Sequence, residues 1–447
     1  MAAPYRVGCA AGFSGDRVDA AGPVVATLAR HGGPSCLVFE TLAERTLALA
    51  QLARRQDPAR GYEPLLDLMV TPILGACLEH GIRIVSNFGQ ANPDGAAMRL
   101  REIARAQKLR PPRIAVIRGD DLSGAAHRAI LRRELGTAFD RVSVVAANAY
   151  LGAEPIAAAL AAGADIVVAG RVADPSLVVG PVMAHYGVSP DDWARLGRAT
   201  MAGHLLECGS QVTGGYFADP GIKDVPGLER VGFPIAEIDA EGACVVTKAD
   251  ATGGLVTART VKEQLLYEVH DPAAYLTPDV TADIGEAEVR ELGADRVALE
   301  GVRGHPRPER LKVTVCHEGG WLAEGEISYA GAGAEARARL AGDVLKRRLE
   351  GLDVRIDLIG ALSLFADDAG RLMSARDPGD ARDVRLRVAA AHPERAEAER
   401  LAREVTALYC CGPAGGGGVR TAIRQRLDTM SCFVPREEID ARYEMLD

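Results

Sequence analysis

The stretch that decides the fold of this chain runs from Asn148 to Gly215. Residues 148–177 read NAYLGAEPIAAALAAGADIVVAGRVADPSL, and residues 203–215 read GHLLECGSQVTGG. The Ala-rich segment 154–162 predicts a helix that Gly163 ends, and the apolar run 166–169 predicts a strand buried on both faces. Arg171 and Asp174 follow that strand directly. Because ligands in open α/β sheets bind beyond the carboxyl ends of the strands, this position predicts a binding site.

The composition is that of an ordinary globular protein. The chain has 447 residues, 25% of them charged and 48% hydrophobic, and this length predicts two domains. A net charge of −9 argues against a general nucleic-acid-binding surface. Nine scattered cysteines without a Cys-x-x-Cys motif are typical of reduced thiols. With no signal peptide and no run of about 18 apolar residues, we expect a soluble cytoplasmic protein with no membrane segment.

The first two hundred residues repeat one order of elements: a short apolar strand, a polar Gly-rich loop and a helix. This alternation predicts a parallel sheet that is covered by helices on both faces. We therefore predict the α/β class, with a parallel doubly wound sheet as an N-terminal domain at residues 1–208. The strands are expected at residues 5–11, 35–39, 82–85, 114–117, 142–145 and 166–169.

The residue pattern of the sequence changes from Gly209 onward. Glycines are frequent, and residues 231–248 alternate as a hairpin does. Residues 335–349 and 393–408 predict helices, residues 354–360 and 384–389 predict strands, and the Gly-rich run 412–418 is expected to enter a short helix at 419–427. We predict a smaller α+β domain at residues 209–447.

A Gly-rich loop follows the first strand. Its amide groups and the start of the next helix suit an anionic ligand, although no dinucleotide or P-loop motif is present. An Asp or Ser helix cap in a tight turn is the alternative. The candidate binding residues of this loop are Ser14, Gly15, Asp16 and Arg17.

Amide and carboxylate side chains occur in other loops that follow expected strands. Asn87, Asn92, Asp120 and Asn148 belong to this group. Together they suit the orientation of a polar substrate, or a hard cation bound through oxygen. Asx turns explain each residue singly, and Asn92 before Pro93 favours a turn. Because several loops are expected to converge, we predict that these four residues bind substrate.

Arg171 and Asp174 suit two roles. Arg171 can bind a carboxylate or phosphate in bidentate fashion, or it can pair with Asp174. Asp174 before Pro175 is also what a helix N-cap followed by proline looks like. We assign both residues to the site.

His204, Glu207 and Cys208 form the most reactive combination. Spacings of three and four residues place their side chains on one face of a helix. Histidine moves protons near neutral pH, glutamate can fix its tautomer, and Cys208 is a candidate nucleophile or a small apolar filler. Zinc ligation and a purely structural role are the alternatives, and we predict no metal.

Two further features carry a candidate chemistry. Gly415, Gly416 and Gly417, at the start of an expected helix, suit a phosphate or the pyrophosphate of an acyl-CoA, with a flexible connector as the alternative. Lys248 and Lys312 are rare lysines on expected strands, where one could meet a carboxylate or a thioester oxygen.

Several of these stretches together resemble the acyclic terpene utilisation family, the AtuA-type proteins. They include GFSGDR (12–17), SNFGQANPDG (86–95), GADIVVAGRVADPSL (163–177) and GHLLECGSQVTGG (203–215). The family takes its name from the bacterial breakdown of citronellol and geraniol through CoA thioesters of branched acids. The resemblance thus implies acyl-CoA catabolism. Many members carry a further small ferredoxin-like domain, which we do not find before Asp447, so a separate small ferredoxin-like partner chain is expected.

Two hypotheses follow. In the first, the protein is a cofactor-independent lyase or hydratase acting on a CoA thioester or related carboxylic acid. His204, aided by Glu207, removes a proton next to the carbonyl, and Arg171 or the amides of residues 12–17 stabilise the enolate oxygen. In the second, it is a non-catalytic subunit that binds acyl-CoA or a partner. A metal-dependent hydrolase is a weaker third option. A homo-oligomer is expected in either case.

Overall fold

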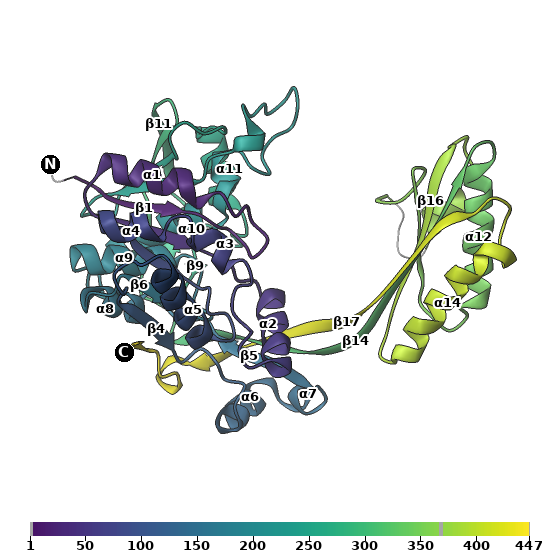
Figure 1. Ribbon diagram of the computed structural model, residues 1–447, viewed down its shortest axis with the longest axis horizontal. Coiled ribbons are helices and arrows are strands. Elements are labelled where there is room, and N and C mark those ends of the chain that lie inside the picture. Colours follow the sequence, from purple (N-terminus) through teal and green to yellow (C-terminus); the bar gives the residue numbers. More distant parts are fainter. Residues whose placement is uncertain (1–2, 366–369, 447) are drawn as a thin grey trace. The chain divides into compact units, whose positions relative to one another are not determined.

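The computed structural model describes residues 3–365 and 370–446. The chain divides into two compact units (Figure 1). Unit 1 comprises Met1–Cys316 and Thr429–Asp447, and unit 2 comprises His317–Asp428. Two long strands, β14 (Arg310–Ala330) and β17 (Gly417–Pro435), contribute residues to both units.

Unit 1 is built on a ten-stranded mixed sheet with the order β11-β12-β8-β7-β1-β2-β3-β6-β4-β18. Its middle strands are parallel: β1 (Tyr5–Cys9), β2 (Ser35–Phe39), β3 (Arg83–Ser86), β6 (Ile166–Val168) and β4 (Ile114–Arg118). The outer strands are antiparallel: β7 (Pro234–Ile238), β8 (Cys244–Lys248), β12 (Arg296–Glu300) and β11 (Glu288–Gly293) at one side, and β18 (Arg442–Met445) at the other. The α/β class is confirmed, with a mixed sheet.

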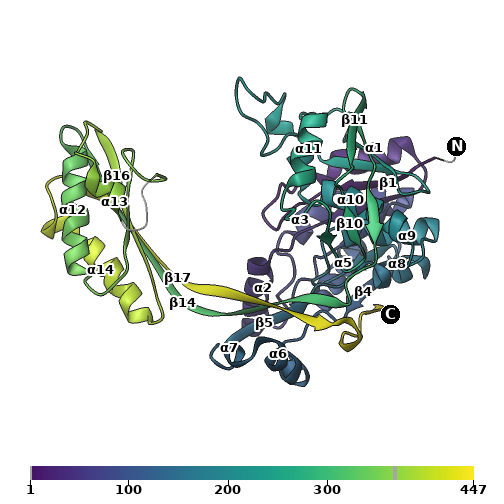
Figure 2. The ribbon, with the colours of Figure 1, turned by 180° about the vertical axis from the view of Figure 1, so that it is seen from behind.

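The boundary predicted between Cys208 and Gly209 falls inside unit 1. The reason is the pairing of β7 with β1, which brings the chain after residue 209 into the same sheet as the first strand. The strand expected at 142–145 also differs. It is found as β5 (Val144–Ala149), which lies beside β14 (Figure 2) and pairs with it instead of joining the parallel strands. In the large sheet, β4 occupies the place between β6 and β18.

Alternate residues of the parallel strands face two separate cores. Leu37, Ile84 and Ile166 belong to a core with helices α1 (Ala21–His31), α3 (Leu66–Val70), α4 (Leu74–His80) and α5 (Pro93–Ala106). Val38 and Val85 belong to a second core with α8 (Glu154–Ala161), α9 (Ser176–Tyr186) and α10 (Trp193–Glu207). Both faces of these strands are therefore buried, as their continuous apolar sequences predict.

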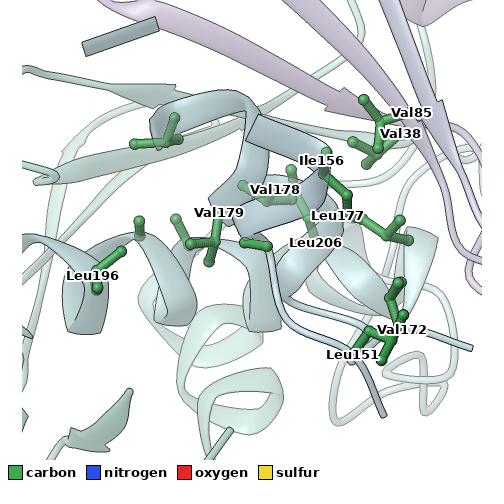
Figure 3. Packing of buried hydrophobic residues seen from close by; sticks show 14 of the residues in the cluster. Val38, Val85, Leu151, Ile156, Val172, Leu177, Val178, Val179, Leu196 and Leu206 are labelled. Atoms are coloured by element: carbon green, nitrogen blue, oxygen red, sulfur yellow. The ribbon is translucent and has the colours of Figure 1, made fainter. Parts of the chain in front are cut away.

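Helix α9 shows why this second core forms. Its sequence SLVVGPVMAHY is apolar on nearly every side, and such a helix is stable only when it is surrounded. Leu177, Val178 and Val179 are buried between the strands that carry Val38 and Val85 and the helix that carries Leu206 (Figure 3). Among the described residues, no helix combines the length and the apolar character that a membrane span needs.

The remaining elements of unit 1 frame the parallel strands. Helix α2 (Glu44–Gln56) packs on β5, and α6 (Arg128–Leu135) and α7 (Thr137–Asp140) precede that strand. A small sheet has the order β13 (Arg303–His305), β10 (Thr281–Asp283) and β9 (Tyr275–Leu276). Helix α11 (Ala258–Leu266) begins with a capping box between Thr257 and Thr260.

Unit 2 follows a βαββαβ succession: β14, α12 (Ala334–Arg348), β15 (Arg355–Ile359), β16 (Asp383–His392), α14 (Arg395–Cys411) and β17, with the short α13 (Arg371–Ala375) before β16. The strand order β15-β16-β14-β17 makes this a ferredoxin-like arrangement. Both long helices share one core with the strands. A ferredoxin-like unit is thus present inside the chain, where the sequence analysis expected one only on a partner.

The helix expected at residues 419–427 is wrong, because this segment lies within β17. Gly415 and Gly418 before it adopt positive φ, so the chain turns here and does not enter a helix. Val419 and Ile423 then pack against the core of unit 2 from an extended strand.

Candidate functional site

Polar side chains gather at the carboxyl ends of the parallel strands in unit 1. Glu40 follows β2, Asn87 follows β3, Asp120 follows β4 and Arg171 follows β6. All four are buried, with exposed fractions between 0% and 6%. The expected convergence of loops at this edge is therefore what the structure shows.

Asp120, Asn148 and Arg171 are in direct contact. The Oδ2 atom of Asp120 accepts a hydrogen bond from Nδ2 of Asn148 at 3.0 Å and from the backbone N–H of Arg171 at 2.8 Å. Burial raises the pKa of Asp120 to about 6, although these hydrogen bonds act in the opposite direction. A carboxyl group with such a pKa changes charge close to neutral pH.

The guanidinium group of Arg171 is held by the protein itself. It donates to the carbonyl oxygen of Leu42 at 3.0 Å, to the carbonyl oxygen of Val172, and to the carboxylate of Asp174 in a close ion pair. Asp174 is not the cap of α9, whose N-cap position is Pro175. The pairing of these two residues, one of the predicted alternatives, is confirmed, and Arg171 is 2% exposed.

Asn87 and Glu40 also form a buried pair. The side-chain oxygen of Asn87 accepts from the backbone N–H of Thr41 at 2.7 Å, and its Nδ2 donates to Glu40 Oε1 at 2.7 Å. Burial raises the pKa of Glu40 to about 7, and the charge of Arg171 opposes that rise. Sequence reasoning missed Glu40, although it carries the same signal as Asp120: an acidic residue directly after a buried strand.

An open cavity of about 630 Å³ lies next to this polar cluster, in unit 1. Its apolar lining comes from Pro175, Leu276, Pro278, Leu311 and Phe433. Its polar lining includes Tyr150, Asp174, Tyr275 and Lys312, with Arg310 at the same cavity. Mostly apolar walls with a few polar groups are typical of sites for small molecules.

Lys312 and Tyr150 lie next to each other in the cavity wall. The Nζ atom of Lys312 lies 3.3 Å from Glu44 Oε1 and 4.6 Å from the centre of the Tyr150 ring. The Arg171 guanidinium carbon lies 4.5 Å from the same ring. Burial by itself raises the pKa of Glu44, but the hydrogen bond from Tyr150 and the charge of Lys312 lower it to about 2. Glu44 is therefore ionised, and the Lys312 ammonium group lies within ion-pair distance of it.

His204 and Glu207 form a buried pair behind the cavity. His204 Nδ1 lies 2.8 Å from Glu207 Oε1, and the His204 ring centre lies 5.1 Å from that of Tyr275, which lines the cavity. Burial lowers the pKa of His204, but the Glu207 carboxylate raises it by a larger amount, so the pKa lies above its usual value. His204 is 1% exposed and does not line this cavity. Its role as the base stays a prediction.

Cys208 has a protonated thiol. Burial raises its pKa to about 12, and the Glu207 carboxylate adds to the rise. A thiol with this pKa is a poor nucleophile, which favours the alternative of an apolar filler. Among the described residues, no group of three or more His, Cys, Asp or Glu side chains is arranged to hold a metal ion.

The loop at residues 12–17 is closed by its own side chain. Asp16 Oδ2 accepts from the N–H of Gly12 at 2.8 Å, and Oδ1 accepts from the N–H of Arg17 at 2.8 Å. Arg17 pairs with Asp19, and Gly15 lies against the Phe13 ring. These contacts match the tight-turn alternative, since they occupy two of the amide groups that an anion needs. Ser14 lines a separate cavity of about 470 Å³.

Two other predicted residues or groups lie outside the cluster. Asn92 is the N-cap of α5, with its side-chain oxygen accepting from Gly95 N at 3.1 Å, which is the Asx alternative. Gly415, Gly416 and Gly417 belong to unit 2. Sequence reasoning missed Glu44 and Tyr275, because no pattern marks an exposed helix start or a two-residue strand as part of a site.

We expect the charge of Glu40 to make the fold less stable as the pH rises. A carboxyl group whose pKa is raised by folding, here from 4.5 to about 7, binds its proton more tightly in the folded state. The free energy of unfolding therefore falls between pH 4.5 and 7, by up to about 3 kcal/mol for this group. Glu40→Gln should flatten that fall, as measured by urea unfolding at several pH values.

Glu79→Gln is the matched control, because Glu79 is exposed on α4. It should leave the pH profile of the wild type unchanged. Part of the fall must persist in Glu40→Gln, since the raised pKa of Asp120 acts with the same sign. A Glu40→Gln profile that coincides with the wild type at every pH contradicts the assignment.

One comparison with known proteins found a match. The family model described as "Acyclic terpene utilisation family protein AtuA" matches residues 5–445, nearly the whole chain and both units. Neither the search of curated proteins nor the search of solved structures found a match.

Proposed function

The chain belongs to the acyclic terpene utilisation family AtuA, and from this premise we propose that it acts on branched-chain or terpenoid carboxylic acids as their CoA thioesters. The proposed reaction is that of a cofactor-independent lyase or hydratase. The observation that carries the proposal is the 630 Å³ cavity, which combines an apolar wall with Lys312 and Asp174.

The apolar wall suits a branched alkyl chain. Leu276 and Phe433 are largely exposed side chains, and Pro175, Pro278 and Leu311 complete the same cavity. Each methylene group that a ligand buries there contributes about 0.8 kcal/mol to binding. A branched acyl chain therefore gains affinity with each methyl branch that the wall covers.

Lys312 supports the carbonyl end of such a ligand. Its ammonium group pairs with Glu44, and it lines the cavity together with Asp174. A fixed positive charge next to a thioester oxygen stabilises the enolate that forms when the α-proton is removed. This role was predicted for Arg171, whose guanidinium group is occupied by Leu42, Val172 and Asp174.

Asp174 is the proposed base in place of His204, because Asp174 lines the cavity and His204 does not. In the direction of dehydration, its carboxylate takes the α-proton while Lys312 holds the enolate oxygen. The enolate then re-forms the carbonyl and the C–O bond at the β-carbon breaks. Asp174 returns the proton to the departing hydroxyl, which leaves as water, so that all atoms and charges balance. Hydration is the same sequence in reverse, and the hydrogen bond from Arg171 holds the Asp174 carboxyl group in place in both protonation states.

Deuterium exchange tests this proposal. The purified protein is incubated in D₂O with branched 3-hydroxyacyl-CoA and enoyl-CoA thioesters, and with straight-chain controls of the same length. Mass spectrometry should show deuterium at the α-carbon and interconversion of the hydroxyacyl and enoyl forms, faster for the branched compounds. If none of the thioesters shows deuterium exchange or interconversion, the lyase or hydratase proposal is rejected.

A non-catalytic acyl-binding subunit is the second candidate. It is favoured by one observation: the two charged groups assigned to catalysis already have partners, Glu44 for Lys312 and Arg171 for Asp174. In that case the thioesters bind without any deuterium exchange. We place either activity in the cytoplasm, which the nine free cysteines support.

A further inference from the structure

The Asp120–Asn148 pair lines another, smaller cavity. Its volume is about 230 Å³, and it shares no lining residue with the 630 Å³ cavity. It is bounded by α2, by the carboxyl end of β4, by the start of α5 and by β5. The residues that line it are Gln51, Arg54, Gln90, Ala91, Pro93, Asp94, Ile117, Arg118, Gly119, Asp120, Asp121 and Asn148.

Two buried polar atoms at this cavity lack partners. The Nε2 of Gln51 and the Oδ1 of Asn148 have no hydrogen bond among the described residues. Gln51 is 7% exposed and Asn148 is 1% exposed. A buried polar atom without a partner destabilises the fold, so two of them at one cavity indicate that a ligand supplies the missing bonds.

The charges around the cavity define which ligand fits. Arg54 lies one helical turn from Gln51 on α2, donates from Nη1 to the carbonyl oxygen of Ala91, and makes no ion pair among the described residues, so its other N–H groups are left for a ligand. Arg118, by contrast, is engaged by Asp94 at 2.6 Å and by Glu444 at 2.9 Å. Arg54, the Gln51 amide and the partially positive N-terminus of α5 therefore form an end that suits a carboxylate.

Two other side chains of the lining accept hydrogen bonds. Asn148 offers its free Oδ1, and Asp120 offers a carboxylate of which Oδ2 alone is used by Asn148 and Arg171. These two acceptors suit a hydroxyl or an amino group of a ligand. The cavity is smaller than the range of about 300–1,000 Å³ that is typical of drug-sized ligands, so only a compact molecule fits.

We propose that this cavity is a second binding site, for a small organic acid that carries a hydroxyl or amino group next to its carboxylate. The carboxylate binds to Arg54 and Gln51, and the hydroxyl or amino group donates to Asn148 and Asp120. The site does not depend on what the larger cavity binds. Asp120 nevertheless connects the two, because it bonds to the backbone of Arg171, whose side chain holds Asp174.

Matched small molecules test the proposal by isothermal titration calorimetry. Lactate and alanine carry both groups, propionate lacks the donor, and lactamide lacks the carboxylate. Lactate or alanine should bind at least about tenfold more tightly than propionate and lactamide, because each omission leaves a buried group unpaired. Equal affinity for all four, or no binding of lactate and alanine at about 10 mM, overturns the proposal.

Variants separate a binding role from a structural one. Gln51→Leu and Arg54→Met should each weaken binding of the preferred acid at least about tenfold. Gln51→Leu should also keep or raise the urea midpoint, because it removes an unpaired buried amide. Thr200→Val is the control: Thr200 is buried with an unpaired hydroxyl but lies outside the cavity, in α10, and binding should stay unchanged. Unchanged binding in both Gln51→Leu and Arg54→Met overturns the proposal.

Discussion

Asp174→Asn is expected to slow exchange of the α-proton of a branched acyl thioester by about 10²- to 10⁴-fold, the range that general bases contribute. The amide keeps an acceptor for the Arg171 guanidinium, so the loop before α9 should keep its shape. It cannot take a proton from carbon. Binding of the thioester should therefore change little, which calorimetry measures alongside the deuterium exchange.

Three further variants are compared with Asp174→Asn. Asp191→Asn, at an exposed position before α10, should exchange as fast as the wild type. Lys312→Met should instead lose exchange together with binding, because it removes the charge that holds the carbonyl end, whereas Lys262→Met on the exposed face of α11 should lose neither. Wild-type exchange in Asp174→Asn refutes Asp174 as the base.

The second large effect concerns stability. Arg171→Met is expected to lower the free energy of unfolding by about 1–3 kcal/mol, the usual cost of leaving buried hydrogen-bond acceptors without their donors. The variant leaves the carboxylate of Asp174 without its cation and the carbonyl groups of Leu42 and Val172 without their donors. Urea unfolding, followed through the transition of unit 1, measures the change.

Arg45→Met is the control for this variant. Arg45 is an exposed arginine on α2. The free energy of unfolding of Arg45→Met should stay within about 0.5 kcal/mol of the wild type. An Arg171→Met protein as stable as Arg45→Met contradicts a central structural role for Arg171. The ligand-binding role first predicted for that side chain then regains support.

The parallel strands and the polar residues that follow them could be predicted from the sequence. A continuous apolar run predicts a buried strand. The carboxyl end of that strand then fixes where the next polar side chain lies, as for Asp120 and Arg171. Helix α8 shows the same local logic, since it begins at Glu154 and ends before Gly163, which adopts positive φ.

Pairings between distant segments could not be predicted in this way. The strand at 144–149 carries the same apolar signal as the others, yet it pairs with β14, which begins more than 150 residues later. That pairing brings Lys312 next to Tyr150 and creates the cavity wall. Lys312 could be named in advance because lysine is rare here, but its partner Glu44 could not.

The roles of side chains at shared loops were also undetermined by sequence. A serine, aspartate or asparagine after a strand suits both a ligand and its own backbone, and only coordinates show which it meets. Asp16 and Asn92 meet their own backbone, whereas Asn148 keeps an oxygen free. His204 and Glu207 do lie on one helical face, as their spacing predicts, but the burial of that face depends on Tyr275 from another element.

A crystal structure with a branched 2-oxoalkyl thioether of coenzyme A tests the central claim most directly. In this compound a methylene group separates the carbonyl carbon from sulfur, so the carbonyl is kept and the thioester bond cannot be hydrolysed. The acyl branch is predicted to lie against Leu276 and Phe433, with its carbonyl oxygen within hydrogen-bonding distance of Lys312 Nζ and its α-carbon next to Asp174. Density for the acyl chain at any other place in the molecule contradicts the account.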